Sequence, residues 1–501
     1  MKIATTSHLP TLLSPAPRAS LALRGLHTVL HEQAQVENVV RVALREGTRN
    51  GHVANAGERA AVASAIFGTS LLRAKLSRLL AMAPPHTSVG AIDPAARRWL
   101  ATAQLLALFL LHETPQRVSC QDMAAALPPG EIGLPAECLD ELAALDWADV
   151  RWPTPLVPRL AARYSLPCSL VRRWSRMLRG SDAEVEALCA ALARPGPVTL
   201  RVNLVAHRTR ASLADSLRAD GIACRAGTLS PWALHLDGDQ GRSAYGGSVW
   251  NLEAWQRGDF EVQDEGSQLV ALACDARSGE RVLDLCAGNG GKTLAMAACV
   301  GASGHVLAHD IVPSRLAALR ASAGRARVDG WVCTTAPVGL AAAAAAHAPA
   351  GHDVVLVDAP CSSSGTLRRH PGLRWSRAWA GESAAAMERR ALPALQLQLL
   401  HQGVSLARDG GRLVYATCAL DTAENEAVAL AFEAARGEQL EPWPFDDEEE
   451  GGGGKEGSTE VASHYRTLWP HRHEGAATDG FFIARWRVRA AAPQPASAID
   501  Q

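Results

Sequence analysis

The sequence predicts a multidomain protein whose C-terminal part is an α/β domain with a doubly wound, Rossmann-like sheet. From residue 259 onward, short apolar segments alternate with segments rich in Ala and Leu, which is typical of alternating strands and helices. One apolar segment runs directly into a glycine-rich turn within residues 281–293. With 501 residues, 48% of them apolar, the chain is long enough for several domains of about 100–200 residues each.

Residues 20–148 are predicted to form an all-α bundle. The apolar residues from Val62 to Leu80 follow a helical stripe, and Pro94 begins a further helix that continues to Leu110. Proline is permitted in the first turn of a helix because its missing N–H would have no partner there. The region contains no catalytic constellation, so we interpret it as a scaffold or docking bundle.

Residues 1–19 are expected to be a flexible N-terminus or an organelle transit segment, because the residues before the first acid, Glu32, are basic, hydroxylated or apolar. No apolar run reaches the roughly 18–20 residues of a membrane span. Eleven Cys without CxxC pairs or His/Cys clusters predict a reducing compartment, no zinc site and no disulfide framework. We therefore expect a cytoplasmic monomer without metal or membrane attachment, or a plastid or mitochondrial protein if the N-terminus is a transit peptide.

Residues 149–245 are predicted to form a small α+β module for RNA recognition or linkage. Residues 198–203 alternate like a strand, residues 207–223 are polar and helical, and short strands continue up to Leu236.

Residues 246–489 make up the predicted α/β domain. An acidic, Gly-rich loop is expected at residues 445–460, and residues 490–501 are expected to be a disordered tail. The candidate strands are residues 281–285, 305–310, 353–358, 412–416 and 481–486.

The formal net charge of −1 conceals a mildly basic chain. Residues 441–460 contain eight acids and one base, so the rest of the chain has 49 basic and 43 acidic residues. Nearly all the basic residues are Arg, whose guanidinium pairs with phosphate and stacks on bases. The charge is therefore compatible with a nucleic-acid partner.

The glycine-rich turn and a later aspartate indicate a cofactor of the adenosine type. Glycines after a strand let backbone amides approach a ligand at the carboxyl edge of the sheet. Gly288 and Gly291 are too close together for the phosphate-loop pattern, which needs four residues between its first Gly and its Gly-Lys pair. Asp310 ends the next predicted strand, nineteen residues after Gly291, where a carboxylate usually binds ribose hydroxyls.

Two cysteines follow the ends of later strands. Cys361 comes soon after Asp358, and Cys418 follows the strand that ends at residue 416. In an open sheet, both positions face the same crevice as the glycine turn. A single cysteine is usually a small buried apolar residue, but two cysteines and an aspartate at one edge favour a reactive site.

These residue types suit methylation of carbon 5 of a cytosine. That carbon is a poor nucleophile until a thiolate adds to carbon 6 and turns the ring into an enamine. A carboxyl group such as Asp358 can hydrogen-bond the ring nitrogen and amino edge of the base and stabilise the developing charge. A base must then remove the carbon 5 proton so that the thiol can leave. Position alone does not decide which of the two cysteines attacks.

The same blocks resemble the Nol1/Nop2/Sun family of RNA cytosine-5 methyltransferases. The N-terminal bundle resembles the NusB-like domain of the bacterial RsmB type, which modifies small-subunit ribosomal RNA. The resemblance covers about residues 20–488. It implies S-adenosylmethionine as the cofactor and 5-methylcytosine in RNA, above all in 16S-type ribosomal RNA, as the product. The matching segments are residues 262–268, 284–293, 358–361, 366–371, 415–418, 424–426 and 479–482.

The resemblance also implies roles for individual residues. Cys418 is the nucleophile, Cys361 helps to release the product, and Asp358 lies between cofactor and cytosine. The implied cofactor-binding residues are Asp310, Asp358 and the turn residues Cys286, Ala287, Gly288, Asn289, Gly290, Gly291 and Lys292.

The chain departs from the family pattern near the adenine. The family usually carries an Asp at the end of its third strand, but residues 332–337 have no acid and Asp329 comes too early. One alternative is therefore a non-catalytic RNA-binding factor for ribosome assembly. The same chemistry on tRNA or another RNA is a second alternative. A DNA cytosine-5 methyltransferase is disfavoured, because that class uses a Pro-Cys cysteine and lacks the NusB-like region.

Overall fold

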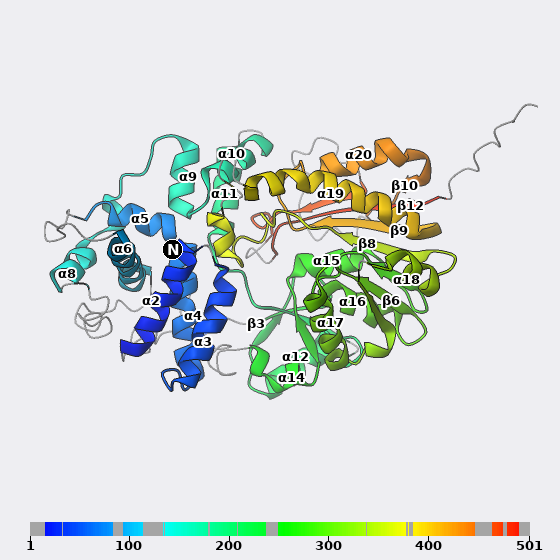
Figure 1. Cartoon of the computed structure of the whole chain (residues 1–501), viewed down its shortest axis with the longest axis horizontal. Coiled ribbons are helices and arrows are strands. Elements are labelled where there is room, and N and C mark those ends of the chain that lie inside the picture. Colours follow the sequence, from blue (N-terminus) through cyan, green and yellow to red (C-terminus); the bar gives the residue numbers. More distant parts are fainter. Residues whose placement is uncertain are drawn as a thin grey trace, which may run out of the picture.

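The computed structural model of the chain describes residues 16–32, 34–83, 94–113, 134, 136–178, 181–207, 209–236, 249–336, 338–376, 379, 384–445, 463–473 and 478–489. Most of the segment at 1–19, nearly all of the acidic loop at 445–460 and the tail at 490–501 lie outside these residues. Figure 1 shows the N-terminal helices on the left, the large sheet and its helices on the right, and the small sheet between them.

The N-terminal part is the predicted all-α bundle, with one apolar core that includes Ile66 and Phe109. The stripe from Val62 to Leu80 belongs to two helices, because Leu72 ends the first and begins the second. Periodicity does not reveal this break, since both helices bury apolar side chains in the same core. The described elements are α2 (Ala16–His31), α3 (Val36–Arg49), α4 (Ala56–Leu71), α5 (Arg73–Leu80), α6 (Pro94–Leu108), η1 (Phe109–Glu113) and α8 (Ala136–Ala144).

The middle of the chain begins with three helices that pack on the C-terminal domain. They are α9 (Leu156–Tyr164), α10 (Cys168–Met177) and α11 (Asp182–Leu192), and their core includes Leu367 and Leu420. A four-stranded antiparallel sheet follows, in the order β2-β3-β1-β4, with α12 (Arg210–Ala219) packed against it. The strand β4 of this sheet lies after residue 245, where the module was predicted to end. The strands are β1 (Thr199–Val202), β2 (Cys224–Ala226), β3 (Ala233–Leu236) and β4 (Phe260–Val262).

The C-terminal part contains an eight-stranded sheet in the order β10-β12-β9-β8-β5-β6-β7, with β11 paired to β12. The five strands from β9 to β7 are parallel, and β12 is antiparallel to β9. The candidate strands are confirmed to within a few residues. The strands are β5 (Arg281–Asp284), β6 (His305–His309), β7 (Val332–Thr335), β8 (His352–Asp358), β9 (Ala407–Thr417), β10 (Leu440–Pro442), β11 (Tyr465–Leu468) and β12 (Phe481–Val488).

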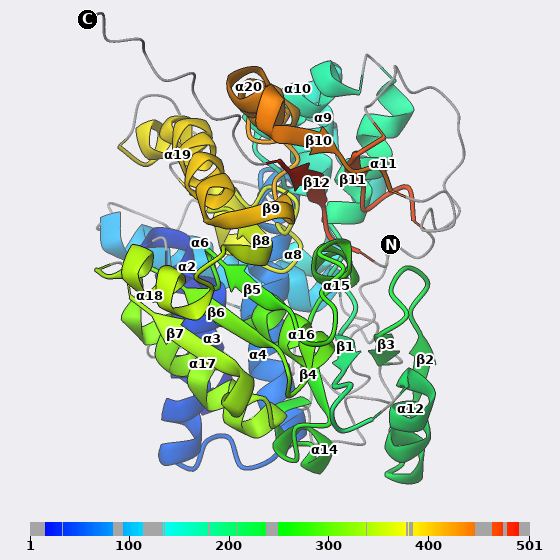
Figure 2. The ribbon, with the colours of Figure 1, turned by 90° about the vertical axis from the view of Figure 1, so that its right-hand side faces the viewer.

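Helices cover both faces of this sheet, as a doubly wound fold requires. Alternate strand residues point to opposite faces, so Val354 and Val355 belong to different cores. One face carries α15 (Glu265–Ala273), α16 (Gly291–Val300) and α17 (Pro313–Ala326). The other carries α18 (Leu340–His347), α19 (Ala384–Leu406) and α20 (Glu426–Arg436), as Figure 2 shows from the side. No helix in the described part of the chain is long and apolar enough to cross a membrane.

A pair of histidines lies at the N-terminal end of β8, opposite to the end at Asp358. His352 Nδ1 lies 3.0 Å from the Leu406 carbonyl oxygen, so Nδ1 carries the proton and Nε2 accepts from His347 Nδ1 at 3.1 Å. His347 Nε2 is then a buried acceptor that has no hydrogen-bond partner among the described residues. Burial, followed by His352 and Arg281, lowers the pKa of His347 to about 4.

We therefore expect this histidine to make the fold sensitive to acid. Because the folded pKa is below the unfolded value, the unfolded chain binds the extra proton between about pH 6.5 and 4. The stabilisation is complete above that range and is lost as the pH falls through it. Between pH 7.5 and pH 5, the free energy of unfolding measured in urea should fall more for the wild type than for His347→Gln. Equal losses in the two proteins would contradict the assignment.

Candidate active site

The candidate site lies where four parallel strands end at one edge of the sheet. β5 ends at Asp284, β6 at His309, β8 at Asp358 and β9 at Thr417. The structure therefore brings the glycine turn, Asp310, Asp358 and both candidate cysteines to the same edge, as their positions in the sequence predicted.

The turn after β5 has the backbone geometry that only glycine adopts readily. Gly288 has φ +54° and Gly290 has φ +91°, and Gly290 begins α16. A Cβ on Gly290 would lie 2.6 Å from Leu319, whereas one on Gly288 would meet open space. Ala287 donates to the His309 carbonyl at 2.8 Å, which joins the turn to β6. Of the other turn residues, Asn289 is exposed and Cys286 half-buried.

Asp310 is part of the same turn rather than a remote side chain. Its Oδ2 accepts from the Gly288 amide at 2.9 Å and its Oδ1 accepts from the Val312 amide at 2.7 Å. The residue is 5% exposed. Next to it, Ile311 is 70% exposed, an apolar side chain at the edge where an adenine is expected. β7 carries no acid, which confirms the departure noted for residues 332–337.

Two charged residues join the turn to the cysteines. Lys292 Nζ lies 2.6 Å from Asp358 Oδ2. Burial opposes the charge on Lys292, but the Asp358 carboxylate outweighs it and raises the pKa of the ammonium. Lys292 thus stays charged and pairs with Asp358 at the end of β8.

Cys361 Sγ and Cys418 Sγ are 3.3 Å apart. Cys418 Sγ also lies 3.5 Å from Ser363 Oγ. The contacts with Cys361 and Ser363 lower the pKa of Cys418 against the effect of burial. The bond to Cys418 and burial, with a contribution from Glu424, raise the pKa of Cys361. Of the two thiols, Cys418 is therefore the more readily deprotonated.

Two neighbouring residues fix the loops that carry the cysteines. Glu424 is 2% exposed, and its Oε2 accepts from the Ser362 amide at 2.8 Å. Asn425 binds the two residues that flank Cys418. Its Oδ1 accepts from Thr417 Oγ1 at 2.6 Å, and its Nδ2 donates to the Ala419 carbonyl at 3.0 Å. The sequence identifies residues 424–426 as a segment that resembles the family, but it does not indicate this role.

Ser363 and Asp284 were also missed as site residues. Ser363 has φ +56°, a conformation that favours glycine, and the strained backbone holds its hydroxyl against Cys418. Asp284 Oδ2 accepts from Thr293 Oγ1 at 2.7 Å, while Oδ1 is buried without a partner among the described residues. Burial raises the pKa of Asp284 to about 7. Asp284 belongs to the matching segment 284–293, but nothing in the sequence distinguishes its two oxygens.

This geometry fits an adenosylmethionine-type ligand. The open space at Gly288 admits a close approach to the backbone, and the unpartnered Asp284 oxygen can accept from an ammonium group. In the described part of the chain, no group of three or more His, Cys, Asp or Glu side chains could hold a metal ion.

Comparisons with known proteins agree with this geometry. Residues 271–487 match the family described as 16S rRNA methyltransferase RsmB/F, and residues 167–241 match a ferredoxin-like domain of RsmF/B-like methyltransferases. The crystal structure of PH0851 has a TM-score of 0.70 at 22% identity and covers 94% of this chain and 98% of its own. It supports the fold over nearly the whole length.

Two curated relatives have names of the same kind. The probable ribosomal RNA small subunit methyltransferase B of Bacillus subtilis is 30% identical over 346 residues, which are 66% of this chain and 68% of the relative. The ribosomal RNA small subunit methyltransferase F of Escherichia coli is 31% identical over 320 residues, 62% of this chain and 61% of the relative. The family predicted from the motifs is confirmed: the chain belongs to the RsmB/F family of methyltransferases.

Proposed function

We propose that this protein methylates carbon 5 of a cytosine in small-subunit ribosomal RNA, with S-adenosylmethionine as the methyl donor. The relatives named as small-subunit rRNA methyltransferases support the substrate. The observation that carries the chemistry is the pair of thiols 3.3 Å apart, polarised toward Cys418 and next to the Lys292–Asp358 ion pair.

The residues of the site then take the following parts in the reaction. The Cys418 thiolate adds to carbon 6 of the cytosine, and Asp358 accepts a hydrogen bond from the amino edge of the base. S-adenosylmethionine supplies an electrophilic methyl group for carbon 5. After the carbon 5 proton has been removed, Cys418 leaves as a thiolate, and Cys361 assists this release. Ser363 stabilises the thiolate before and after the reaction, and Glu424 and Asn425 position the two loops.

We assign cofactor binding to the turn residues 286–292, Asp310, Asp358 and the buried Asp284. Asp310 is placed to bind the ribose, and exposed Ile311 supplies an apolar surface for the adenine in place of the absent acid of β7.

The other domains are proposed to serve RNA binding. We infer that α2 to α8 form a NusB-like docking domain and that the small sheet contributes to RNA recognition. We also propose that the protein acts in the cytoplasm, as a monomer and without a metal.

Asp310→Ala should weaken S-adenosylmethionine binding by about 1.5–3 kcal/mol, since it removes a charge-assisted hydrogen-bond acceptor. Titration calorimetry measures this change directly. Asp329→Ala is the matched control, because Asp329 is exposed and precedes β7. An unchanged affinity in the Asp310 variant would remove this residue from the cofactor site.

The function is tested by bisulfite sequencing of total RNA from cells with and without the gene. A 5-methylcytosine in small-subunit rRNA should disappear with the gene and return with the wild-type copy but not with Cys418→Ala. Loss of a site in tRNA alone would change the proposed substrate. If no cytosine responds, the chain is not acting as an RNA cytosine-5 methyltransferase in those cells.

A further inference from the structure

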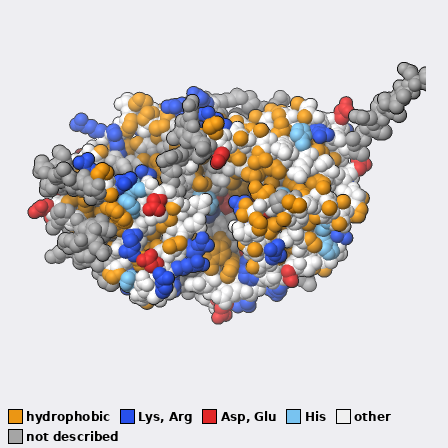
Figure 3. Space-filling model, viewed as in Figure 1, with side chains coloured by type: hydrophobic (Ala, Val, Ile, Leu, Met, Phe, Trp, Pro, Cys, Tyr) orange, Lys and Arg blue, Asp and Glu red, His pale blue; other side chains and the backbone are white. Residues whose placement is uncertain are grey.

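A polar pocket of about 480 Å³ lies away from the cysteines, between the small sheet and the C-terminal end of α17. Figure 3 shows Lys and Arg scattered over the visible face rather than gathered into one basic stripe. The pocket contains a local group of cationic side chains of its own. Its lining residues are Ala206, His207, Ser216, Arg257, Asp259 and Arg327.

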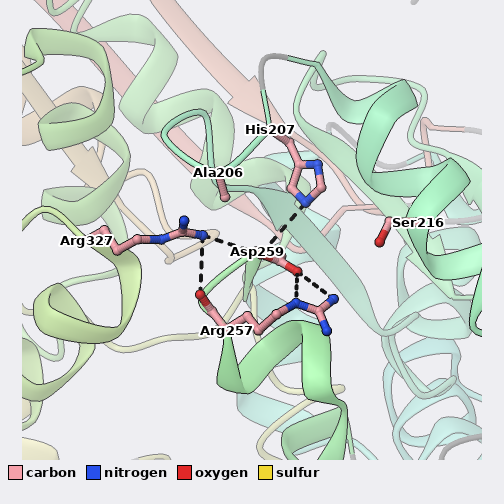
Figure 4. Close-up of a pocket in the computed structure, with 6 residues that line it drawn as sticks. All are labelled: Ala206, His207, Ser216, Arg257, Asp259 and Arg327. Atoms are coloured by element: carbon pink, nitrogen blue, oxygen red, sulfur yellow. Dashed lines mark hydrogen bonds and ion pairs between the residues drawn. The ribbon is translucent and has the colours of Figure 1, made fainter.

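Three potentially cationic side chains converge on one buried carboxylate (Figure 4). Asp259 is 6% exposed, and its Oδ2 accepts from Arg257 Nε at 2.9 Å. Its Oδ1 lies 3.5 Å from Arg327 Nη2 and 3.8 Å from His207 Nε2. Arg327 also donates to the Arg257 carbonyl at 3.3 Å. Arg257 and Arg327, two permanent positive charges, therefore share the single buried carboxylate of Asp259.

The arginines are held in place but remain accessible. The side chains of Arg257 and Arg327 are 48% and 53% exposed, although their shared carboxylate is buried. Arg257 Nη1 lies 3.7 Å from the highly exposed Glu253, a contact that water screens. A guanidinium has five donors in a rigid fork that matches phosphate oxygens. Fixing it in advance reduces the entropy lost when a phosphate binds.

The backbone at Arg327 has a conformation that favours glycine. Arg327 follows α17 with φ +63°, a left-handed position where glycine is the usual residue and where the Cβ of any other residue adds strain. The small size of glycine would serve the helix end better. An arginine there contributes its guanidinium to the pocket.

An exposed aromatic ring lies in the segment that leads to Arg257. Trp250 is 50% exposed, and its ring centroid lies 5.2 Å from that of Trp255, which is two residues before Arg257. An exposed tryptophan beside arginines suits unpaired bases of RNA, which stack on aromatic side chains.

We propose that this pocket binds a phosphodiester of the RNA substrate, with Arg257 and Arg327 as its ligands and Asp259 as the residue that positions them. The inference rests on the proposed function, because it takes RNA as the substrate. It adds a contact remote from the reacting base, which contributes to the affinity for RNA without touching the chemistry.

The test uses the full-length Arg257→Gln/Arg327→Gln double variant. The RNA dissociation constant and KM should rise about tenfold, and the slope of log affinity against log salt should fall in magnitude by about 0.7–0.9 for each lost phosphate contact. The value of kcat at saturating RNA and the affinity for S-adenosylmethionine should not change. The matched control is Arg218→Gln, because Arg218 is 55% exposed in the same module and its ion pair within the described residues is with exposed Asp215.

The variant Arg327→Gly distinguishes the loss of an RNA contact from a folding defect. Glycine relieves the left-handed backbone, so this variant should be as stable as the wild type or more so, yet it should lose part of the RNA affinity. A salt slope identical to that of Arg218→Gln would overturn the proposal. So would inorganic phosphate that binds the wild type but not the double variant while RNA affinity stays equal, because the pocket would then serve a small phosphate. If the wild type itself methylates no rRNA, the proposed function fails; if it does and the double variant matches the control, only this inference fails.

Discussion

Cys418→Ala is expected to abolish methylation, by roughly 10³-fold or more, and to form no covalent complex with RNA. Alanine cannot add to carbon 6, so no enamine forms. Cys361→Ala should still form the adduct, because Cys418 remains close to Ser363 and Lys292. It should release the adduct poorly and leave a protein–RNA species that survives denaturing gel electrophoresis. The two substitutions remove the same atom from thiols 3.3 Å apart, so the difference between them is a test of role rather than of position.

The controls separate a role in catalysis from a general effect of losing a thiol. Cys168→Ala removes an exposed cysteine at the start of α10 and should behave as the wild type. RNA containing 5-fluorocytosine should trap the wild type, because the fluorine blocks removal of the group at carbon 5. If Cys418→Ala traps RNA and Cys361→Ala does not, the roles are reversed. If no protein is ever trapped, covalent catalysis is wrong and the non-catalytic assembly factor becomes the better account.

The catalytic edge could be predicted from the sequence because its signals are local. A buried strand followed by glycines predicts a turn. The residues that follow parallel strands lie at the same edge of the sheet. Gly288, Asp310, Asp358, Cys361 and Cys418 could therefore be placed together before any coordinates were known.

The residues that tune this edge could not be predicted in the same way. Glu424 and Asn425 act on loops that are 62 and 8 residues away in the chain, through single hydrogen bonds that leave no periodic pattern. The polarity of the thiol pair depends on which hydroxyl faces which sulfur. The role of Ser363 follows from a positive φ, which its residue type does not reveal. Likewise β4 joins the small sheet through a pairing with β1 across some 60 residues.

Arg374 is the strongest case of a long-range contact that the sequence concealed. It lies in the short helix η5 (Pro371–Trp375), soon after the loop of Cys361, and it is 1% exposed. Its guanidinium donates to the carbonyls of Leu71, Tyr164, Ser165, Leu192 and Leu367. Among the described residues, no carboxylate pairs with it. Leu71, Tyr164 and Leu192 are the last residues of α4, α9 and α11.

Three helix C-termini therefore converge on one buried cation. Each terminus carries partial negative charge and carbonyls without intrahelical partners, which explains how a guanidinium is tolerated there without a counterion. Burial still lowers the pKa of Arg374 to about 9, so the residue remains charged at neutral pH. Neighbouring Trp375 donates to the Ser70 carbonyl at 3.2 Å. These contacts join the N-terminal bundle and the middle helices to the segment that follows the catalytic loop.

Arg374→Met should cost about 3 kcal/mol of stability or more and should loosen the contact between the N-terminal bundle and the catalytic domain. Methionine is of similar length but donates nothing, so several buried carbonyls lose their partner at about 1–3 kcal/mol each. Arg374→Lys should be intermediate, because a compact ammonium has three donors and cannot reach all five oxygens. Urea unfolding and limited proteolysis measure the two effects. Arg277→Met is the control, since Arg277 is 66% exposed and its surface pair with Asp275 should contribute less than about 1 kcal/mol. If Arg374→Met lowers the free energy of unfolding no more than this control does, the three helix ends are held together without the guanidinium.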